Sequence, residues 1–126
     1  MARPPSQTLT EGELEIMRIV WELERVTVRE VHEQLAKTKK VAYTTVMTTM
    51  GILADKGHLV RKKAGRAYVY EPVEPRAEVI SGMVGEFVDR VFEGSAKPLL
   101  VHLVKDRRLS RSDLDALREM IDGVDE

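Results

Sequence analysis

Residues 42–72 read AYTTVMTTMGILADKGHLVRKKAGRAYVYEP, a helical pattern followed by a glycine and two strand-like pieces. We expect the helix to run from about residue 42 to residue 56 and to stop at Gly57, because glycine readily takes the left-handed conformation that ends helices. Residues 67–71 carry two tyrosines and a valine, which favour strand, and a glycine-containing joint connects them to the β-prone residues 58–63. The stretch therefore predicts one helix followed by a β-hairpin.

Two capping boxes predict two more helices before this stretch. Thr10 with Glu13 opens one helix and Thr27 with Glu30 opens the other, since each threonine can accept from a first-turn amide while the glutamate reaches back. The first helix carries apolar residues at helical spacing, and the second ends at about Ala36. Helix, helix, helix and hairpin is the order of a winged helix-turn-helix domain. We therefore predict a mainly α fold with a small β-hairpin wing.

The chain after Pro75 reads as wholly helical, over about residues 76–93, 95–105 and 111–122. The first of these helices carries an unusually wide apolar stripe. A surface of this kind is too apolar to leave exposed, which favours the pairing of two subunits. The alternative is that the stripe packs inside its own subunit against the two later helices. The residues assigned to the pairing surface are Ile80, Met83, Val84, Phe87, Val91, Leu99, Leu100 and Leu103.

Charge divides along the chain in a similar way. Residues 1–72 hold 12 basic and 9 acidic side chains, and residues 73–126 hold 8 and 12, so a net of +3 is followed by a net of −4. A basic first part and an acidic second part suggest different partners for each. We expect a winged-helix DNA-binding domain over residues 1–74 and a helical dimerisation region over residues 75–126.

The outward side of the helix in residues 42–56 is rich in threonine. Stepping 100° per residue places Tyr43, Val46, Thr49, Met50 and Leu53 on one face, which we expect to meet the core. Early outward residues of such a helix are presented to base edges in the major groove, where a threonine hydroxyl can hydrogen-bond and its methyl can touch thymine. The alternative is that threonines are tolerated on a solvated helix. The residues assigned to base reading are Thr44, Thr45, Met47 and Thr48.

Basic residues flank this helix on both sides. Residues 37–66 hold eight basic side chains and one acid, although the whole chain has a net charge of only −1. A charge run is often only a solvated face, but a helix inserted between two phosphate backbones needs cations on both of its sides. The residues assigned to phosphate contacts are Lys39, Lys40, Lys56, Arg61, Lys62, Lys63 and Arg66.

Composition argues against several other classes of protein. The 126 residues include no cysteine, no apolar run that approaches the roughly 20 residues of a membrane span, and no apolar core of a signal peptide, so we expect a cytoplasmic protein. His32-Glu33 begins like a zinc-protease helix, but Ala36 stands where that motif needs its second histidine. Neither a phosphate loop nor a Gly-x-Ser-x-Gly turn is present. We predict no catalytic residues, no metal site and no cofactor.

The same stretches resemble the penicillinase and methicillin-resistance repressor family (BlaI/MecI), together with the related copper repressor CopY. The similar segments are LTEGELEIMRIVWE at residues 9–22, TVREVHEQL at 27–35, the quoted residues 42–72, FVDRVFEGSAKPLLVHLV at 87–104 and LSRSDLDALREMI at 109–121. The resemblance covers nearly the whole chain. It implies a homodimeric transcriptional repressor of operator DNA with two inverted half-sites, in which C-terminal helices pair the subunits. It also implies that the four residues assigned to base reading lie on the DNA-reading helix.

The resemblance also bears on how such a repressor is released. Family members are commonly inactivated when a transmembrane antibiotic-sensing protease signals cleavage of an Asn-Phe bond, which implies a membrane sensor protease or another signalling protein as a partner. This sequence has no asparagine, and His102-Leu103 aligns with that bond as the equivalent position. The copper branch senses metal through C-terminal cysteines, so copper sensing of that kind is excluded here.

Two classes of function remain open on the residues alone. The first is a sequence-specific DNA-binding repressor. The second is a winged-helix protein-interaction module whose basic face meets an acidic protein partner.

Overall fold

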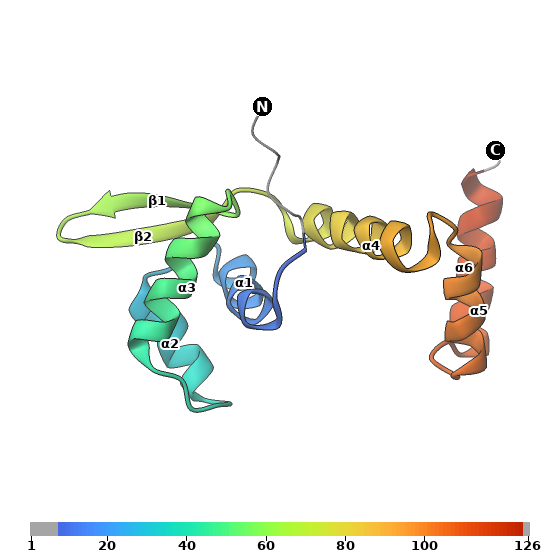
Figure 1. Cartoon of the computed structure of the whole chain (residues 1–126), viewed down its shortest axis with the longest axis horizontal. Coiled ribbons are helices and arrows are strands. Elements are labelled where there is room, and N and C mark those ends of the chain that lie inside the picture. Colours follow the sequence, from blue (N-terminus) through green and yellow to red (C-terminus); the bar gives the residue numbers. More distant parts are fainter. Residues whose placement is uncertain (1–7, 125–126) are drawn as a thin grey trace. The chain divides into compact units, whose positions relative to one another are not determined.

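Three helices, a two-stranded hairpin and three more helices follow one another along residues 8–124, the part of the chain that the computed structural model describes (Figure 1). The elements are α1 (Glu11–Leu23), α2 (Val28–Ala36), α3 (Tyr43–Asp55), β1 (Leu59–Ala64), β2 (Ala67–Pro72), α4 (Arg76–Phe92), α5 (Lys97–Lys105) and α6 (Arg111–Val124). The predicted fold class, mainly α with a small hairpin, is confirmed. No helix among these residues is long and apolar enough to cross a membrane.

Capping boxes start α1 and α2, as predicted. Thr10 Oγ1 accepts from the N–H of Glu13 at 3.1 Å, and the Glu13 carboxylate accepts from the N–H of Thr10 at 2.9 Å. The same two bonds join Thr27 and Glu30, also at 3.1 and 2.9 Å. Each box satisfies N–H groups that the start of a helix leaves without an intrahelical partner.

One face of α3 forms the centre of the buried core. Val46, Met50 and Leu53 each have an exposed fraction of 0 %. Buried side chains from α1, α2, the two strands and α4 complete this core, namely Ile16, Met17, Val20, Val31, Leu35, Leu59, Tyr70 and Val79. Full burial of side chains of this size contributes roughly 1.5–3 kcal/mol each. The core therefore determines how α3 is rotated about its own axis.

A glycine in the left-handed conformation ends α3, as the sequence predicts. Gly57 has a φ of 86°, and the N–H of His58 reaches back to the Leu53 carbonyl at 2.9 Å. This bond satisfies one of the carbonyls that the end of a helix leaves open. The chain can therefore turn directly from α3 into β1.

The wing is the antiparallel pair of β1 and β2, whose register ends with Ala64 opposite Ala67. The loop between them is Gly65-Arg66, and Gly65 has a φ of 64°. Glycine at the first position of a two-residue hairpin loop is a preferred choice because it accepts a positive φ. Ala64 therefore pairs in the ladder, and the joint is one residue shorter than predicted.

A third extended segment, which the sequence does not predict, joins the wing. Val26 and Tyr70 exchange both backbone bonds, at 3.0 Å from Val26 N–H and 2.7 Å from Tyr70 N–H. The indole Nε1 of Trp21 also donates to the carbonyl of Glu74 at 3.1 Å, which ties α1 to the chain that leaves β2. A bridge of one residue pair has too short a sequence signal to be recognised as a strand.

The change between two compact units of the structure falls inside α4. The first unit ends at Val84 and the second begins at Gly85. Val79 is buried in the core of the first unit, and Met83 packs against that core. The beginning of the apolar stripe is therefore used within the winged-helix unit. The assignment of separate roles to residues 1–74 and 75–126 stays a prediction.

The second unit buries little of its own apolar surface. Phe92 contacts the ring edge of Phe87 at 5.8 Å between centroids and the ring of His102 at 5.9 Å, while Val88 is 9 % exposed. Its exposed apolar side chains are Phe87, Val91, Leu100, Val101, Val104, Leu114, Leu117, Met120, Ile121 and Val124.

A reciprocal cap also starts α6, directly before residues 111–122, which the sequence predicts to be helical. The N–H of Ser110 donates to Asp113 Oδ2 at 2.9 Å, and the N–H of Asp113 donates to the Ser110 hydroxyl oxygen at 3.0 Å. Hydrogen bonds from the Ser110 backbone and then from its side chain favour the ionised carboxylate, so the pKa of Asp113 is lowered.

Candidate nucleic-acid interface

The outward side of α3 presents the four side chains assigned to base reading. Thr44, Thr45 and Thr48 are exposed, and Met47 is 47 % exposed. They lie opposite the buried face of the helix, so they project from a rigid element. A side chain on a packed helix is positioned more accurately than one on a loop.

Tyr43 is exposed, which corrects the expectation that it faces the core. It is 45 % exposed, and its ring meets the edge of the His32 ring at 5.7 Å. His32 Nε2 lies 2.8 Å from the Val41 carbonyl and so ties α2 to the segment before α3. As the first residue of α3, Tyr43 lies beyond the turn that the core covers. Thr49, also expected in the core, is half-buried, and its hydroxyl donates to the Thr45 carbonyl at 2.8 Å.

The wing carries different chemistry on its two faces. Arg61 lies over the ring of Tyr68, with its Cζ 4.4 Å from the ring centroid. Lys62 pairs with Glu71 at 2.9 Å. Successive residues of a strand point to opposite faces, so Lys63 shares the face of Arg61 and not that of Lys62. One wing face therefore joins cations to an aromatic ring, and the other holds a lysine that is already paired with an acid.

The two lysines before α3 also differ. Lys39 pairs with Glu15 of α1 at 3.1 Å, and its side chain is 46 % exposed. Lys40 is exposed, and no ion pair to it is recorded within residues 8–124. An exposed pair of this kind is weakly held, so a phosphate can compete for Lys39.

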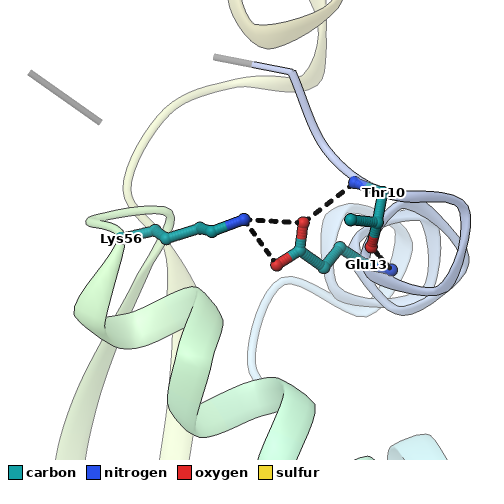
Figure 2. Close-up of polar contacts among 3 residues, drawn as sticks. All are labelled: Thr10, Glu13 and Lys56. Carbon is teal, nitrogen blue, oxygen red and sulfur yellow. Dashed lines mark hydrogen bonds and ion pairs between the residues drawn. The ribbon is translucent and has the colours of Figure 1, made fainter. Parts of the chain in front are cut away.

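Lys56 has a partner that the sequence does not predict. Its Nζ lies 3.0 Å from Oε1 and 2.9 Å from Oε2 of Glu13, the glutamate of the first capping box (Figure 2). The side chain of Glu13 is 5 % exposed and that of Lys56 is 33 % exposed. The ammonium group thus ties the end of α3 to the start of α1. This bidentate contact opposes the phosphate role assigned to Lys56.

Burial and hydrogen bonding act in opposite directions on the Glu13 carboxylate. Burial raises its pKa, but the bond from the Thr10 backbone, the bond and charge of Lys56 and the bond with the Thr10 side chain lower it. The net effect is a pKa of Glu13 below its usual 4.5. The carboxylate is therefore held in its charged form by groups from both α1 and α3.

A hollow of about 580 Å³ lies between the first turn of α2, α3 and the wing. Aromatic and arginine side chains dominate its walls, and the lining residues are Thr27, Val28, Arg29, Tyr43, Met47, Arg61, Arg66, Ala67, Tyr68 and Tyr70. We call it the wing hollow. The sequence does not mark Arg29, because only the packing of α2 brings it to the same place as Arg61 and Arg66.

The residues assigned to subunit pairing divide into two groups. Val84, Phe87, Val91 and Leu100 are exposed, whereas Ile80, Met83, Leu99 and Leu103 are half-buried. His102 and Leu103, the position equivalent to the family's cleavage bond, lie within the hydrogen-bonded helix α5. No group of three or more metal-ligating side chains occurs in the described part of the chain.

The core-packed helix α3, its outward threonines and the adjoining basic hairpin define a protein of the winged helix-turn-helix class. The sequence profile of the penicillinase repressor family matches residues 9–123. The chain therefore belongs to the penicillinase repressor family, whose relatives include the penicillinase repressor of Bacillus licheniformis and the methicillin resistance regulatory protein MecI of Staphylococcus aureus.

Individual relatives agree with this assignment. The transcriptional regulator BlaI of Mycobacterium tuberculosis is 39 % identical over 114 residues, which cover 87 % of this chain and 81 % of that protein. The solution structure of the DNA-binding domain of the repressor BlaI has a TM-score of 0.53 at 31 % identity, over 62 % of this chain and 93 % of that one. The monomeric form of Bacillus licheniformis BlaI in complex with the blaP half-operator has a TM-score of 0.50 at 31 % identity, with the same coverage.

Replacing Lys56 by methionine tests the tie between α1 and α3. We expect Lys56→Met to lower the free energy of unfolding by about 1–3 kcal/mol, because it leaves a buried carboxylate without its cation. Lys39→Met is the matched control, since it removes an exposed lysine that pairs with the same helix, and we expect a loss of less than about 0.5 kcal/mol. Urea unfolding measures both losses. Equal losses would show that the pair of Lys56 with Glu13 stabilises the fold no more than the exposed pair of Lys39 with Glu15.

The lowered pKa of Glu13 predicts a stability that depends on pH. The contribution of Glu13 to the free energy of unfolding is fully present above a pH of about 4.5, the pKa of its carboxyl in the unfolded chain. It is lost as the pH falls through the lower pKa of the folded state. We expect Glu13→Gln to be less stable than wild type near neutral pH and the difference to shrink on acidification. Glu22→Gln, at an exposed acid of the same helix, is the control variant. Urea unfolding across the pH series contradicts the assignment if the Glu13→Gln difference does not change.

Proposed function

We propose that this protein is a homodimeric transcriptional repressor that binds inverted-repeat operator DNA through its winged helix. The observation that supports it most directly is the outward threonine face of α3, set between a basic wing and the lysines that precede the helix. A relative of the same fold has been solved on a half-operator. The proposal places the protein in the cytoplasm, where it has access to DNA.

Within this proposal, base contacts and phosphate contacts fall to different side chains. Thr44, Thr45, Met47 and Thr48 read bases, because α3 presents them from a rigid helix. The side chains that approach phosphates are Lys39, Lys40, Arg61, Lys63 and Arg66. Lys62 contributes less, since Glu71 already pairs with it, and Lys56 serves mainly to hold α3 against α1.

The proposed homodimer forms through the helices that follow the wing. The exposed fractions of Phe87, Val91 and Leu100 are 40 %, 49 % and 49 %. Large apolar side chains left this exposed on consecutive helices favour an interaction surface. A two-fold pairing also doubles the number of base contacts and sets the spacing of two half-sites.

Release of the repressor by a membrane sensor protease or another signalling partner completes the proposal. The equivalent of the family's cleavage position, His102-Leu103, lies inside α5 and holds no Asn-Phe bond. A protease that cuts there must first open this helix, because proteases cleave locally unfolded chain. A different release signal is equally compatible with the proposed DNA binding.

Substitutions of Thr48 and Arg66 separate the proposed base and phosphate roles. We expect Arg66→Ala to weaken binding to all duplexes alike and to reduce the slope of log affinity against log salt by about 1. Thr48→Ala should instead change discrimination between the selected operator and its single-base variants by roughly tenfold. Fluorescence anisotropy with duplexes selected from a random pool measures both effects. Equal binding of wild type to operator and scrambled duplex would contradict sequence-specific recognition. A duplex affinity that lacks a steep, linear fall with log salt would favour the protein-interaction module with an acidic partner.

Leu100→Asp tests the pairing surface. We expect it to convert the dimer to a monomer and to weaken binding to a two-site operator by at least about tenfold, while binding to a single half-site is retained. Leu23→Asp is the control, since Leu23 is similarly exposed, at 42 %, but lies at the end of α1. Sedimentation velocity gives the oligomeric state. A monomeric wild type, or a dimeric Leu100→Asp variant, would contradict the assignment.

A further inference from the structure

The stacked pair Arg61 and Tyr68 stands out among the basic residues of the wing. The guanidinium carbon lies 4.4 Å from the centre of the tyrosine ring, although Tyr68 is 45 % exposed. Arg61 stands opposite Tyr70 in the ladder, so Tyr68 is its diagonal neighbour. Diagonal neighbours on one face are within reach of long and aromatic side chains. Local strand geometry therefore produces the contact.

Stacking of this kind leaves the donor edge of the guanidinium open. A guanidinium that packs its flat face on a ring keeps its N–H groups free in the plane, where they can donate two parallel bonds to a phosphate. A free arginine loses side-chain entropy when it binds, and a stacked one has lost part of it already. Lysine cannot replace arginine here, because it has no flat face that matches the ring.

Both stacked residues line the wing hollow, and two more arginines line it with them. Arg66 comes from the hairpin loop, and Arg29 comes from the first turn of α2, where it pairs at 3.2 Å with Glu33. The side chains of Arg29 and Glu33 are 81 % and 60 % exposed, so this pair is open to competition by a phosphate. Among residues 8–124, no acidic side chain lines the hollow.

We propose that the wing hollow holds one stretch of the operator's sugar–phosphate backbone. Tyr68 is a positioning residue that holds Arg61 toward a phosphate of that stretch. Arg29 makes a further phosphate contact. The inference rests on the proposed DNA binding and adds the place where one strand lies. It assigns Tyr68 no base contact. Tyr43, on the α3 side of the hollow, faces the sugars of the same strand.

Binding of duplex DNA by single and double variants tests the positioning role. We expect Arg61→Ala to weaken binding about tenfold and Tyr68→Leu about two- to five-fold, the range of an exposed cation–π contact. Tyr68→Phe keeps the ring and should stay within about twofold of wild type. In the Arg61→Ala background, Tyr68→Leu should cause no further loss, because the two residues act as one unit. A full additional loss in that background would show that Tyr68 acts on its own and would overturn the positioning role.

Replacing one phosphate of the duplex at a time by an uncharged methylphosphonate locates the phosphate that each arginine contacts. One methylphosphonate substitution in the duplex should weaken binding by the wild-type protein but leave the affinity of Arg61→Ala unchanged. A substitution at an adjacent phosphate should weaken wild-type binding but leave the affinity of Arg29→Ala unchanged. If no methylphosphonate position behaves in this way, the proposal that the wing hollow holds the DNA backbone is overturned. Arg18→Ala is the matched control, since it removes the same charge from a separate hollow beside Trp21, and its affinity should equal that of wild type. Thermal unfolding of each variant shows that the fold is retained.

The outcomes separate this inference from the function on which it rests. If the wild-type protein shows no preference for any duplex, the proposed function fails. If the wild-type protein binds a selected duplex and Tyr68→Leu binds it equally well, only the positioning role fails.

Discussion

The buried face of α3 is the constraint on which the rest of the winged-helix unit depends. Val46, Met50 and Leu53 are fully buried, although the helix around them contains four threonines and a glycine, which are modest helix formers. A helix of 13 residues with this composition would be marginal alone, so packing against α1 and α2 holds it together. The same packing directs Thr44, Thr45 and Thr48 outward. Stability and the proposed DNA contact therefore come from opposite faces of one helix.

The basic residues around α3 have unequal roles, although they look alike in sequence. Glu13 holds Lys56, so this lysine joins two helices. Glu15 and Glu71 hold Lys39 and Lys62 in more exposed pairs. Tyr68 holds Arg61 without neutralising its charge. A count of cations overstates the charge that DNA can meet, because partners within the protein neutralise some of them.

The two units differ in how completely they bury their apolar residues. The first has a continuous core that includes Val79 and Met83 of α4. The second leaves Leu100, Val104 and most of α6 open to solvent. A wide apolar stripe on its own predicts only that something must cover it, and the structure restricts this requirement to α5, α6 and the later part of α4. The proposed homodimer gives these helices a partner.

Sequence by itself determined the order of the elements, because their signals are local. The capping boxes, Gly57 and the tyrosine-rich strand each act within a few residues, and all appear in the structure as predicted. The family of the protein was readable for the same reason. Tertiary structure alone decided that Lys56 binds Glu13, that Val26 pairs with Tyr70, that Tyr43 leaves the core and that Arg29 joins the wing hollow. Each of these depends on contacts between segments far apart in the chain or on where the core ends, and neither spacing nor composition specifies them.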